Sequence, residues 1–436
     1  MTEQYVADFR AFAGNGAGSA PSWLKEMREG AITRFAELGF PTMKQEEWRF
    51  TSVAPIAETR FKLSHVGPRS SLPSPRDIEP LLLGTGPTIV FIDGKFAPEL
   101  SWAAGLPAGV QVTSLAAALQ VGPLGELARQ HLAGYARWRE SAFAALNTAF
   151  LADGAFVYVP AQTVLEQPLE VLFVATAQGN EGPTVAHPRS LIVIEPGAQA
   201  VVVESYVALA DRVYWTNAVT EVVVGDGARA EYYRVQREGG RAYHVATTHS
   251  QQGRDSFLGL HTVTLGGLLA RHDIHTVLDG AGAELILNGL YLLGRTQHAD
   301  HHTVIDHAKP HCASHEFFNG VLDQRAHGVF NGRIIVRPGA QRTDSKQTNN
   351  NLLLSTEARA DSQPQLEIYA DDVKCTHGST VGPLDETAVH YLRSRGLSPE
   401  TARSLLTYGF AAEILGRMQR ADLRDHLDRL VRAGLA

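Results

Sequence analysis

The chain has 436 residues, of which 44% are hydrophobic and 19% are charged, and its formal net charge is −7. This is the composition of a globular protein with room for one large domain or for two or three smaller ones. The negative charge and the lack of a Lys/Arg-rich block argue against a nucleic-acid partner. No stretch approaches the roughly 18 apolar residues that a membrane-spanning helix needs, so we expect no membrane partner.

The N-terminal sequence and the number of cysteines indicate in which cellular compartment the protein is expected. Residues 1–14 have no basic flank followed by an apolar run, so we expect no signal peptide. Cys312 and Cys375 are the only cysteines, too few for a disulfide framework. A reducing compartment, the cytoplasm, fits this usage better than an oxidising one.

Helices are predicted first along the chain. Apolar residues recur at helical spacing over residues 23–38, and Gly39 ends the run. Residues 78–151 are mixed, with one expected strand at 88–93 and Ala- and Leu-rich segments that fit helices. We therefore assign residues 1–154 to an N-terminal helical or mixed region.

The next region, residues 155–383, reads as short strands joined by similar turns. Runs of β-branched and aromatic residues dominate it, such as those at 157–159, 191–194, 201–203 and 222–224. Four similar turns contain an alanine, and these alanines are spaced by 30, 55 and 57 residues: Ala198, Ala228, Ala283 and Ala340. Weaker matches to the same turn lie near the midpoints of the two longer gaps, at Ser256 and Ala313. A fixed period of this size predicts a stacked solenoid, here a β-helix, whose neighbouring units share one core. The alternative is a large β-sandwich whose turns resemble one another by chance.

The chain is expected to close with two or three helices over residues 384–436. Their apolar residues follow a helical period that Gly396 interrupts. Ser398 fits a helix cap and Pro399 the first helical position. These segments hold more apolar side chains than short helices can bury among themselves, so part of that surface is expected to bind a partner.

Common catalytic motifs are missing from the sequence. The Gly94-Lys95 pair is followed by Phe96, so no phosphate-binding loop of the Gly-x-x-x-x-Gly-Lys-Ser/Thr type occurs. Neither Cys-x-x-Cys, His-Glu-x-x-His nor Gly-x-Ser-x-Gly is present. Asp371 and Asp372 are adjacent and would point apart in a strand, so they do not form the carboxylate pair of a glycoside hydrolase.

Histidines gather in the second half of the β region. Twelve of the 18 fall between His244 and His327, and the densest set lies at residues 298–315 together with Asp300 and Asp306. One interpretation is a metal site, because imidazole and carboxylate groups suit iron and zinc. The other, which we favour, is a set of hydrogen-bonded side chains on stacked strands, since adjacent residues such as His301 and His302 face opposite ways in a strand.

Cys375 and His377 form the most specific candidate site. They lie two residues apart, which in a strand puts both side chains on one face. A thiolate and an imidazole suit an ion such as iron(II), but two ligands do not fill a coordination sphere. The missing ligands would come from elsewhere in the chain or from a partner, and the alternative is a purely structural pair.

Five stretches of the chain, in order, resemble the SufB/SufD family of SUF iron–sulfur cluster assembly scaffold proteins. They are Pro41-Thr42-Met43-Lys44-Gln45-Glu46-Glu47-Trp48-Arg49-Phe50-Thr51, Phe330-Asn331-Gly332-Arg333-Ile334, residues 347–355, residues 371–378, and residues 391–397 with Gly409-Phe410. The low cysteine count and the Cys-x-His-Gly at 375–378 fit the SufD members better than the SufB members. Thr376 stands where Ser is common, a mild departure.

The resemblance implies a mainly β chain with a right-handed parallel β-helix core between N- and C-terminal helical regions. It further implies pairing with a SufB-like paralogue, binding of a SufC-like ATPase through the C-terminal helices, and no catalysis by this chain itself. Iron or a nascent cluster would be held transiently where the two paralogues meet, with no tightly bound cofactor. His377, with Cys375 beside it, is the implied metal ligand, and the residues expected at the ATPase interface are Tyr391, Leu392, Leu405 and Phe410.

Other functions stay open at this point. An isolated chain is also compatible with a homodimer. A metal-dependent enzyme built on the His/Asp segment 298–315 is the main alternative, and a carbohydrate-active β-helix is a third. Co-purification discriminates among them, because a scaffold brings an ATPase and a paralogue with it.

Overall fold

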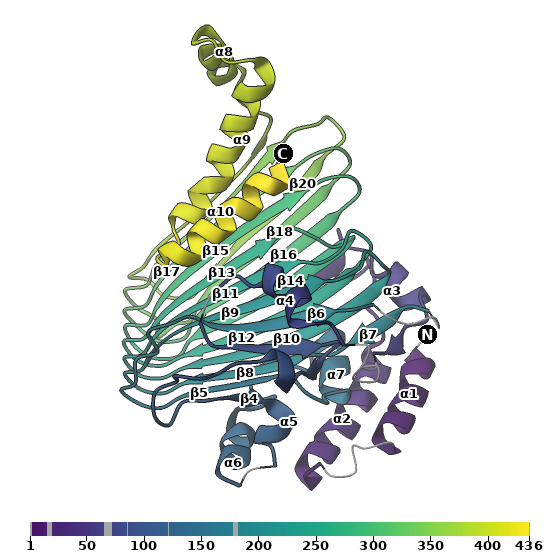
Figure 1. Cartoon of the computed structure of the whole chain (residues 1–436). Coiled ribbons are helices and arrows are strands. Elements are labelled where there is room, and N and C mark those ends of the chain that lie inside the picture. The colour runs from purple at the N-terminus through teal and green to yellow at the C-terminus, as the bar shows by residue number, and fades with distance from the viewer. Residues whose placement is uncertain are drawn as a thin grey trace.

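Two long parallel sheets wind into a solenoid along most of the chain (Figure 1). The computed structural model describes residues 2–14, 20–64, 72–84, 86–120, 122–177 and 182–435. From β8 onward, successive strands alternate between the two sheets, and neighbours within each sheet are parallel. This topology confirms the predicted β-helix and excludes the β-sandwich.

Each sheet takes every second strand of the solenoid. The first sheet contains β4 (Gln111–Ser114), β5 (Ala155–Val159), β8 (Arg189–Ile194), β10 (Tyr214–Val224), β12 (Tyr243–Gln252), β14 (Leu269–Leu278), β16 (His298–His307), β18 (His327–Val336) and β20 (Arg359–Ile368), with β1 (Lys62–Leu63) and β7 (Thr184–Ala186) at its side. The second contains β2 (Thr88–Ile92), β3 (Lys95–Phe96), β6 (Leu169–Ala175), β9 (Gln199–Ala208), β11 (Arg229–Arg237), β13 (Phe257–Thr264), β15 (Glu284–Leu293), β17 (Ala313–Leu322), β19 (Asp344–Leu353) and β21 (Lys374–Gly382).

The repeated turns mark the corner before the strands of the second sheet. Ala198, Ala228 and Ala283 are fully buried and directly precede β9, β11 and β15. Along the second sheet the register advances by 27 to 31 residues per turn of the solenoid. The 55-residue gap from Ala228 to Ala283 therefore equals two turns, whereas Ala340 lies three residues before Thr343, the position that stacks on Ala283. The glycine before each alanine has a positive φ, for example 68° at Gly197, which a glycine adopts without steric cost.

The helices of the N-terminal region are α1 (Thr2–Gly14), α2 (Ser22–Leu38), α3 (Ala54–Glu58), α4 (Pro75–Ile78), α5 (Leu115–Ala118), α6 (Gly122–His131) and α7 (Ala142–Ala149), with the 3-10 turns η2 (Glu46–Trp48), η4 (Glu79–Leu81) and η5 (Pro98–Leu100). Most of them pack on the outside of the first sheet, whereas α4, η4 and η5 pack on the second. The predicted helix at 23–38 is α2, and it ends at Gly39 with φ 66°. The strand predicted at 88–93 is β2, and β2 and β4 extend the two sheets into the N-terminal region that we had read as helical or mixed.

Three helices follow the solenoid, as predicted: α8 (Glu386–Ser394), α9 (Pro399–Gly416) and α10 (Ala421–Leu435). Ser398 caps α9, because its side chain accepts a hydrogen bond from the backbone N–H of Thr401. The last turns of α9 and all of α10 bury apolar side chains such as Leu415 and Leu427 against the outer face of the second sheet. In Figure 1, α8 and the start of α9 stand away from that sheet. Among the described helices, none is long and apolar enough to cross a membrane.

Candidate functional site at the open end of the solenoid

The two sheets end at β20 and β21, which we call the last rung. Cys375 and His377 lie on β21, opposite Ser345 and Gln347 of β19. Ser345 and Gln347 are buried inside the solenoid, at 1% and 0% exposure. Because side chains at matching positions of stacked parallel strands share a face, Cys375 and His377 both face inward on the last rung. The sequence prediction that they share a face is therefore correct.

These two side chains are uncovered although they face inward. Cys375 is half-buried and packs against the main apolar core, whereas His377 is exposed. No described strand pairs with the outer edge of β21, so the interior of the solenoid is open to solvent there. Among the described residues, no further rung lies over the inward-facing side chains of β21.

The interior becomes polar as it approaches the site. The column of stacked residues that ends at His377, here the His377 column, reads Leu169, Val202, Tyr232, Leu260, Leu287, Glu316, Gln347 and His377. The column that ends at Cys375, the Cys375 column, reads Ala200, Ala230, Leu258, Leu285, Ser314, Ser345 and Cys375. Both columns turn polar two rungs before the candidate ligands.

Hydrogen bonds join the polar members of each column. Gln347 Nε2 donates to Glu316 Oε2 over 2.6 Å in the His377 column. In the Cys375 column the hydroxyl oxygens of Ser314 and Ser345 are 2.8 Å apart. Burial raises the pKa of Glu316 to about 7. The Glu316 carboxyl lies one rung before Gln347 and two rungs before His377. Its hydrogen bond fixes the orientation of the Gln347 side-chain amide, on which His377 stacks.

Burial, with the nearby Asp344 carboxylate, raises the pKa of the Cys375 thiol. The thiol is therefore protonated at neutral pH in the isolated chain, and binding a metal through sulfur would release a proton. Among the described residues, no group of three or more His, Cys, Asp or Glu side chains is placed to hold a metal ion. Cys375 and His377 alone offer at most two ligands.

The surface of the last rung carries exposed apolar side chains. Ile368, Tyr369 and Val381 are 40%, 60% and 47% exposed. Pro364 lies in β20 and removes one backbone donor from that strand, whereas β21 contains no proline. Of the two edges, β21 therefore keeps its full row of backbone donors and acceptors, which is the arrangement that favours pairing with another strand.

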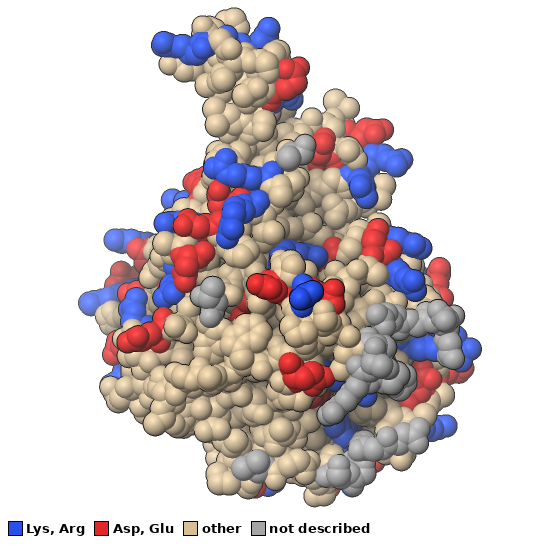
Figure 2. Space-filling view, viewed as in Figure 1, with Lys and Arg blue, Asp and Glu red and all other residues tan. Residues whose placement is uncertain are grey.

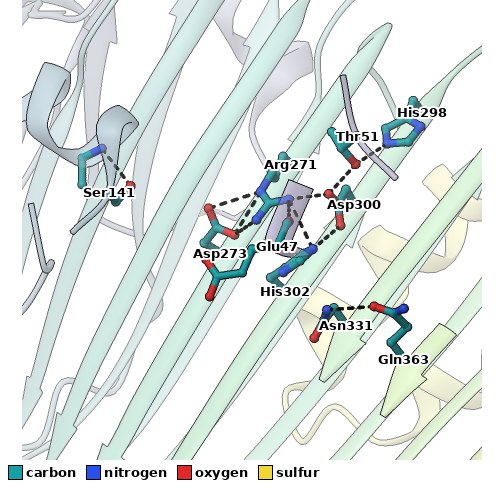
Figure 3. A network of polar contacts seen from close by, with 11 residues as sticks. Glu47, Thr51, Ser141, Arg271, Asp273, His298, Asp300, His302, Asn331 and Gln363 are labelled. Carbon is teal, nitrogen blue, oxygen red and sulfur yellow. Dashed lines mark hydrogen bonds and ion pairs between the residues drawn. The ribbon is translucent and has the colours of Figure 1, made fainter. Parts of the chain in front are cut away.

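The N-terminal stretch 41–51 is fastened to the first sheet by a buried polar network (Figure 3). Arg271 of β14 donates to the carbonyl of Glu47 over 2.8 Å and lies 3.6 Å above the ring of Trp48. Thr51 Oγ1 donates to Asp300 Oδ2 over 2.5 Å and contacts His298 Nε2 at 2.8 Å. This stretch holds the N-terminal region on the solenoid.

An ion pair lies at the centre of the network. Arg271 Nη1 and Asp300 Oδ2 are 2.6 Å apart, and both side chains are almost fully buried. Burial raises the pKa of Asp300, but Arg271 and then His302 overcome this effect and hold that pKa well below its usual range. Each charge has a further partner, since Arg271 also pairs with Asp273 and Asp300 lies 3.0 Å from His302. Removing either side chain would therefore disrupt a buried network rather than a single pair. The bonds of this network to Glu47 and Thr51 specify where the N-terminal stretch docks.

Several histidines of residues 298–315 have structural partners on the stacked strands. His301 faces inward and stacks on Tyr291 with ring centroids 5.0 Å apart, while His302 faces outward and lies 3.0 Å from Asp300. His307 Nε2 lies 2.8 Å from the hydroxyl oxygen of Ser314. This supports the interpretation of hydrogen-bonded side chains on stacked strands.

The four residues expected at the ATPase interface divide into two pairs. Tyr391 and Leu405 are 57% and 49% exposed. Leu392 and Phe410 are partly buried in a small core with Leu352 of β19. In Figure 2 basic and acidic side chains surround the protruding tip formed by α8 and the start of α9. Leu392 and Phe410 thus hold the tip to the solenoid, whereas Leu405 is exposed and Tyr391 contacts only Arg395 of the same tip among the contacts between described side chains.

The polar columns and the docking network were not found from the sequence. Each column joins residues about 30 positions apart in the sequence. Because the number of residues per turn of the solenoid varies, the members of a column cannot be identified until the strand register is known. The docking network joins residues such as Thr51 and Asp300, which are 249 positions apart. The stretch 41–51 stood out in the sequence only through its resemblance to the family motif, which did not say what it contacts.

Comparison with known proteins covers nearly the whole chain. The description "SUF system FeS cluster assembly, SufBD core domain" matches residues 173–410, and "SufBD protein N-terminal region" matches residues 1–171. An iron–sulfur cluster assembly SufBD family protein of Synechocystis sp. is 34% identical over 95% of this chain and 92% of its own length. The iron–sulfur cluster assembly protein SufD of Escherichia coli is 31% identical over 91% of this chain and 89% of its own. SufD of Bacillus subtilis is 28% identical over 91% of each.

Proposed function

The chain belongs to the SufBD family of SUF-system iron–sulfur cluster assembly proteins and is a homologue of SufD, and from that premise we propose that it is a non-catalytic scaffold subunit. In this proposal it pairs with a SufB-like paralogue and binds a SufC-like ATPase, which hydrolyses the ATP. The observation that carries the proposal is the last rung, where two candidate ligands face inward beside a strand edge that no other described strand covers.

Pairing through β21 is the contact that the last rung supports best. An unpaired strand edge with exposed apolar side chains is a ready surface for strand addition. A paralogue with the same fold would supply a matching solenoid and continue both sheets. When the paralogue is absent, the same edge offers a second copy of this chain a place to pair.

Iron, or a nascent cluster, is the cargo of this interface in our proposal. His377 and Cys375 supply up to two ligands, and the paralogue completes the coordination sphere. This is why metal should bind the heterodimer and not this chain alone. Release of the Cys375 proton on binding makes the affinity rise with pH.

The ATPase is proposed to dock on the protruding tip. Tyr391 and Leu405 are large apolar side chains on helices that leave the body of the protein, which is a common form of helix-mediated recognition. The alternative of an independent His/Asp enzyme is not favoured, because His301, His302 and His307 already have structural partners among the described residues. Both cysteines are free thiols, in keeping with the cytoplasmic location that we propose.

Reconstitution tests the proposal directly. The chain is combined under anaerobic conditions with its SufB-like paralogue and SufC-like ATPase, and given ferrous iron, sulfide and ATP. His377→Ala should lower cluster yield, read by visible absorbance, by about tenfold or more because a metal ligand is lost. The complex should still elute as one species, and Cys375→Ser should have a smaller effect.

His315→Ala is the matched control, because His315 is exposed on β17 away from the last rung. It should leave cluster yield unchanged. A normal yield with His377→Ala would remove that residue from the site. Loss of the complex itself would mean that His377 is structural.

A further inference from the structure

A cavity of about 640 Å³ lies between the N-terminal helices and the start of the solenoid, far along the chain from the last rung. Its walls come from α1, α2, β1, the β2–β3 turn, the segment after α7, and β7. The volume falls in the range typical of small-molecule sites. The function proposed above does not use this cavity.

Arg28 lines the cavity with unused hydrogen-bond donors. It is 6% exposed, and its Nη2 donates to the carbonyl of Leu151. Its Nε and Nη1 have no hydrogen-bond partner in the part of the chain that the structure describes. Burial lowers the pKa of Arg28 to about 10, so the side chain stays charged at neutral pH. A buried cation with unpaired donors is costly unless an acceptor binds there.

His187 adds a second unused donor to the same wall. It is 7% exposed and stacks on Phe150, with ring centroids 5.2 Å apart. Asn217 Nδ2 must be a donor, because it lies 3.0 Å from the carbonyl of Phe143, and the same nitrogen is 3.1 Å from His187 Nδ1. Nδ1 therefore accepts, and in the neutral ring the proton sits on Nε2.

The ring of His187 is neutral at physiological pH, since burial lowers its pKa to about 3. Its Nε2–H has no hydrogen-bond partner within the described residues. Two side chains that line one cavity are thus more than nine-tenths buried and carry N–H groups without acceptors among the described residues.

The charged and aromatic side chains that line the cavity indicate which class of ligand it would bind. The cavity lining contains four cationic and two acidic side chains, in a chain of net charge −7; the cationic ones are Arg28, Arg60, Lys62 and Lys95, and the acidic ones are Asp8 and Asp93. Phe12 and Phe150, whose ring centroids are 5.5 Å apart, form an apolar part of the wall. The ligand should therefore combine an anionic group with an apolar body.

We propose that this cavity binds a small organic anion, a carboxylate or phosphate ester with an aromatic-sized apolar part, through Arg28 and His187. The anionic oxygens accept the free N–H groups of these two residues, and the apolar part packs on Phe12 and Phe150. Arg60 and Lys95 are exposed on the rim and attract the anion.

Isothermal titration calorimetry of the full-length chain with phenyl phosphate at low ionic strength tests the proposal. Binding is expected in the millimolar range or tighter, with benzyl alcohol at least about tenfold weaker, because it lacks the charge. Arg28→Gln should weaken phenyl phosphate binding about tenfold or more. Arg325→Gln, the same charge change at an exposed turn between β17 and β18, should have no effect.

The rim double variant Arg60→Gln/Lys95→Gln keeps the test decisive if Arg28→Gln fails to fold, because both residues are exposed. It should weaken phenyl phosphate binding by about threefold or more and leave benzyl alcohol binding unchanged. Absence of phenyl phosphate binding by the wild type, equal affinities for the two probes, or unchanged binding by the double variant would overturn the proposal. Circular dichroism shows whether each variant is folded.

Discussion

The two ends of the solenoid differ in how they are finished. At the N-terminal end every residue of β2 is buried, and the antiparallel strands β3 and β4 close the two sheets. Helices such as α5 and α6 cover the first sheet there. At the C-terminal end β20 and β21 have mostly exposed or half-exposed residues and no further strand among those described. The chain closes one end by itself, and the described residues leave the other end uncovered.

The two columns of stacked interior residues also differ between the two ends of the solenoid. Near β6 the two columns are apolar, with Leu169 and Val202 in the His377 column. Near β19 they hold hydrogen-bonded polar groups, with Glu316, Gln347 and the Ser314–Ser345 pair. Buried polar residues lower stability unless they are paired, so a polar interior is kept only where it serves a purpose. Glu204 of β9 also forms a buried network, with Ser190 and Thr220, so the contrast between the two ends holds for these two columns and not for the whole interior.

The largest expected effect comes from placing a charge on the open end. Val381→Lys puts an ammonium group into the surface that we propose the paralogue covers. Burying that charge at an interface without a partner should weaken the heterodimer about a thousandfold, or about 4 kcal/mol. Size-exclusion chromatography and titration calorimetry with the paralogue measure the change.

Val164→Lys is the matched control, since Val164 has a similar exposure of 48% near the closed end. It should leave the affinity for the paralogue unchanged. Equal weakening by both variants would mean that the open end is not the interface.

A smaller effect is expected from removing the buried carboxyl of the open end. The pKa of Glu316, about 7, lies above the value of 4.5 expected in the unfolded chain. The folded protein therefore holds a proton that the unfolded chain releases, and the free energy of unfolding should fall as pH rises from about 4.5 to about 7. Glu316→Gln should remove this dependence and be more stable than wild type by up to about 3 kcal/mol above pH 7.

Urea unfolding of the isolated chain at pH 5 and pH 8 measures this difference. Glu284→Gln, at an exposed position of β15, is the control and should show no added pH dependence. A Glu316→Gln variant that follows the wild-type pH profile would show that the open-end interior is not destabilised by its carboxyl.

The smallest effect is expected at the protruding tip. Leu405→Asp should weaken ATPase binding about tenfold, because an exposed apolar contact is replaced by a charge. Binding to the paralogue should not change. Leu209→Asp, at a residue that is 39% exposed, is the control and should affect neither. Undiminished ATPase binding by Leu405→Asp would place the ATPase elsewhere.

Local signals in the sequence were enough to predict the solenoid. The turn alanines recur because each corner of the solenoid needs a small buried residue, and Ala198 and Ala228 fill that need. The shared face of Cys375 and His377 followed from the two-residue period of a strand alone. Their role as metal ligands stays a prediction, since it depends on a partner that the chain does not contain.

Long-range relations could not be predicted in the same way. Whether β2 and β4 belong to the sheets depends on pairing with β6 and β5, and their short length among helices gives no sign of it. The apolar faces of α9 and α10 looked available for a partner, but residues such as Leu415 and Leu427 pack on the second sheet. A helical pattern gives the apolar face and does not say what covers it.

Hydrogen exchange of the backbone amides tests the central claim, that a partner completes the last rung. In the free chain the amides of β21 that face away from β19 should exchange rapidly, whereas those of β2 should already be protected. Addition of the SufB-like paralogue should slow exchange in β21 by about a hundredfold or more and leave β2 unchanged. Exchange in β21 that is the same with and without the paralogue, in a complex shown to be intact, would contradict the account.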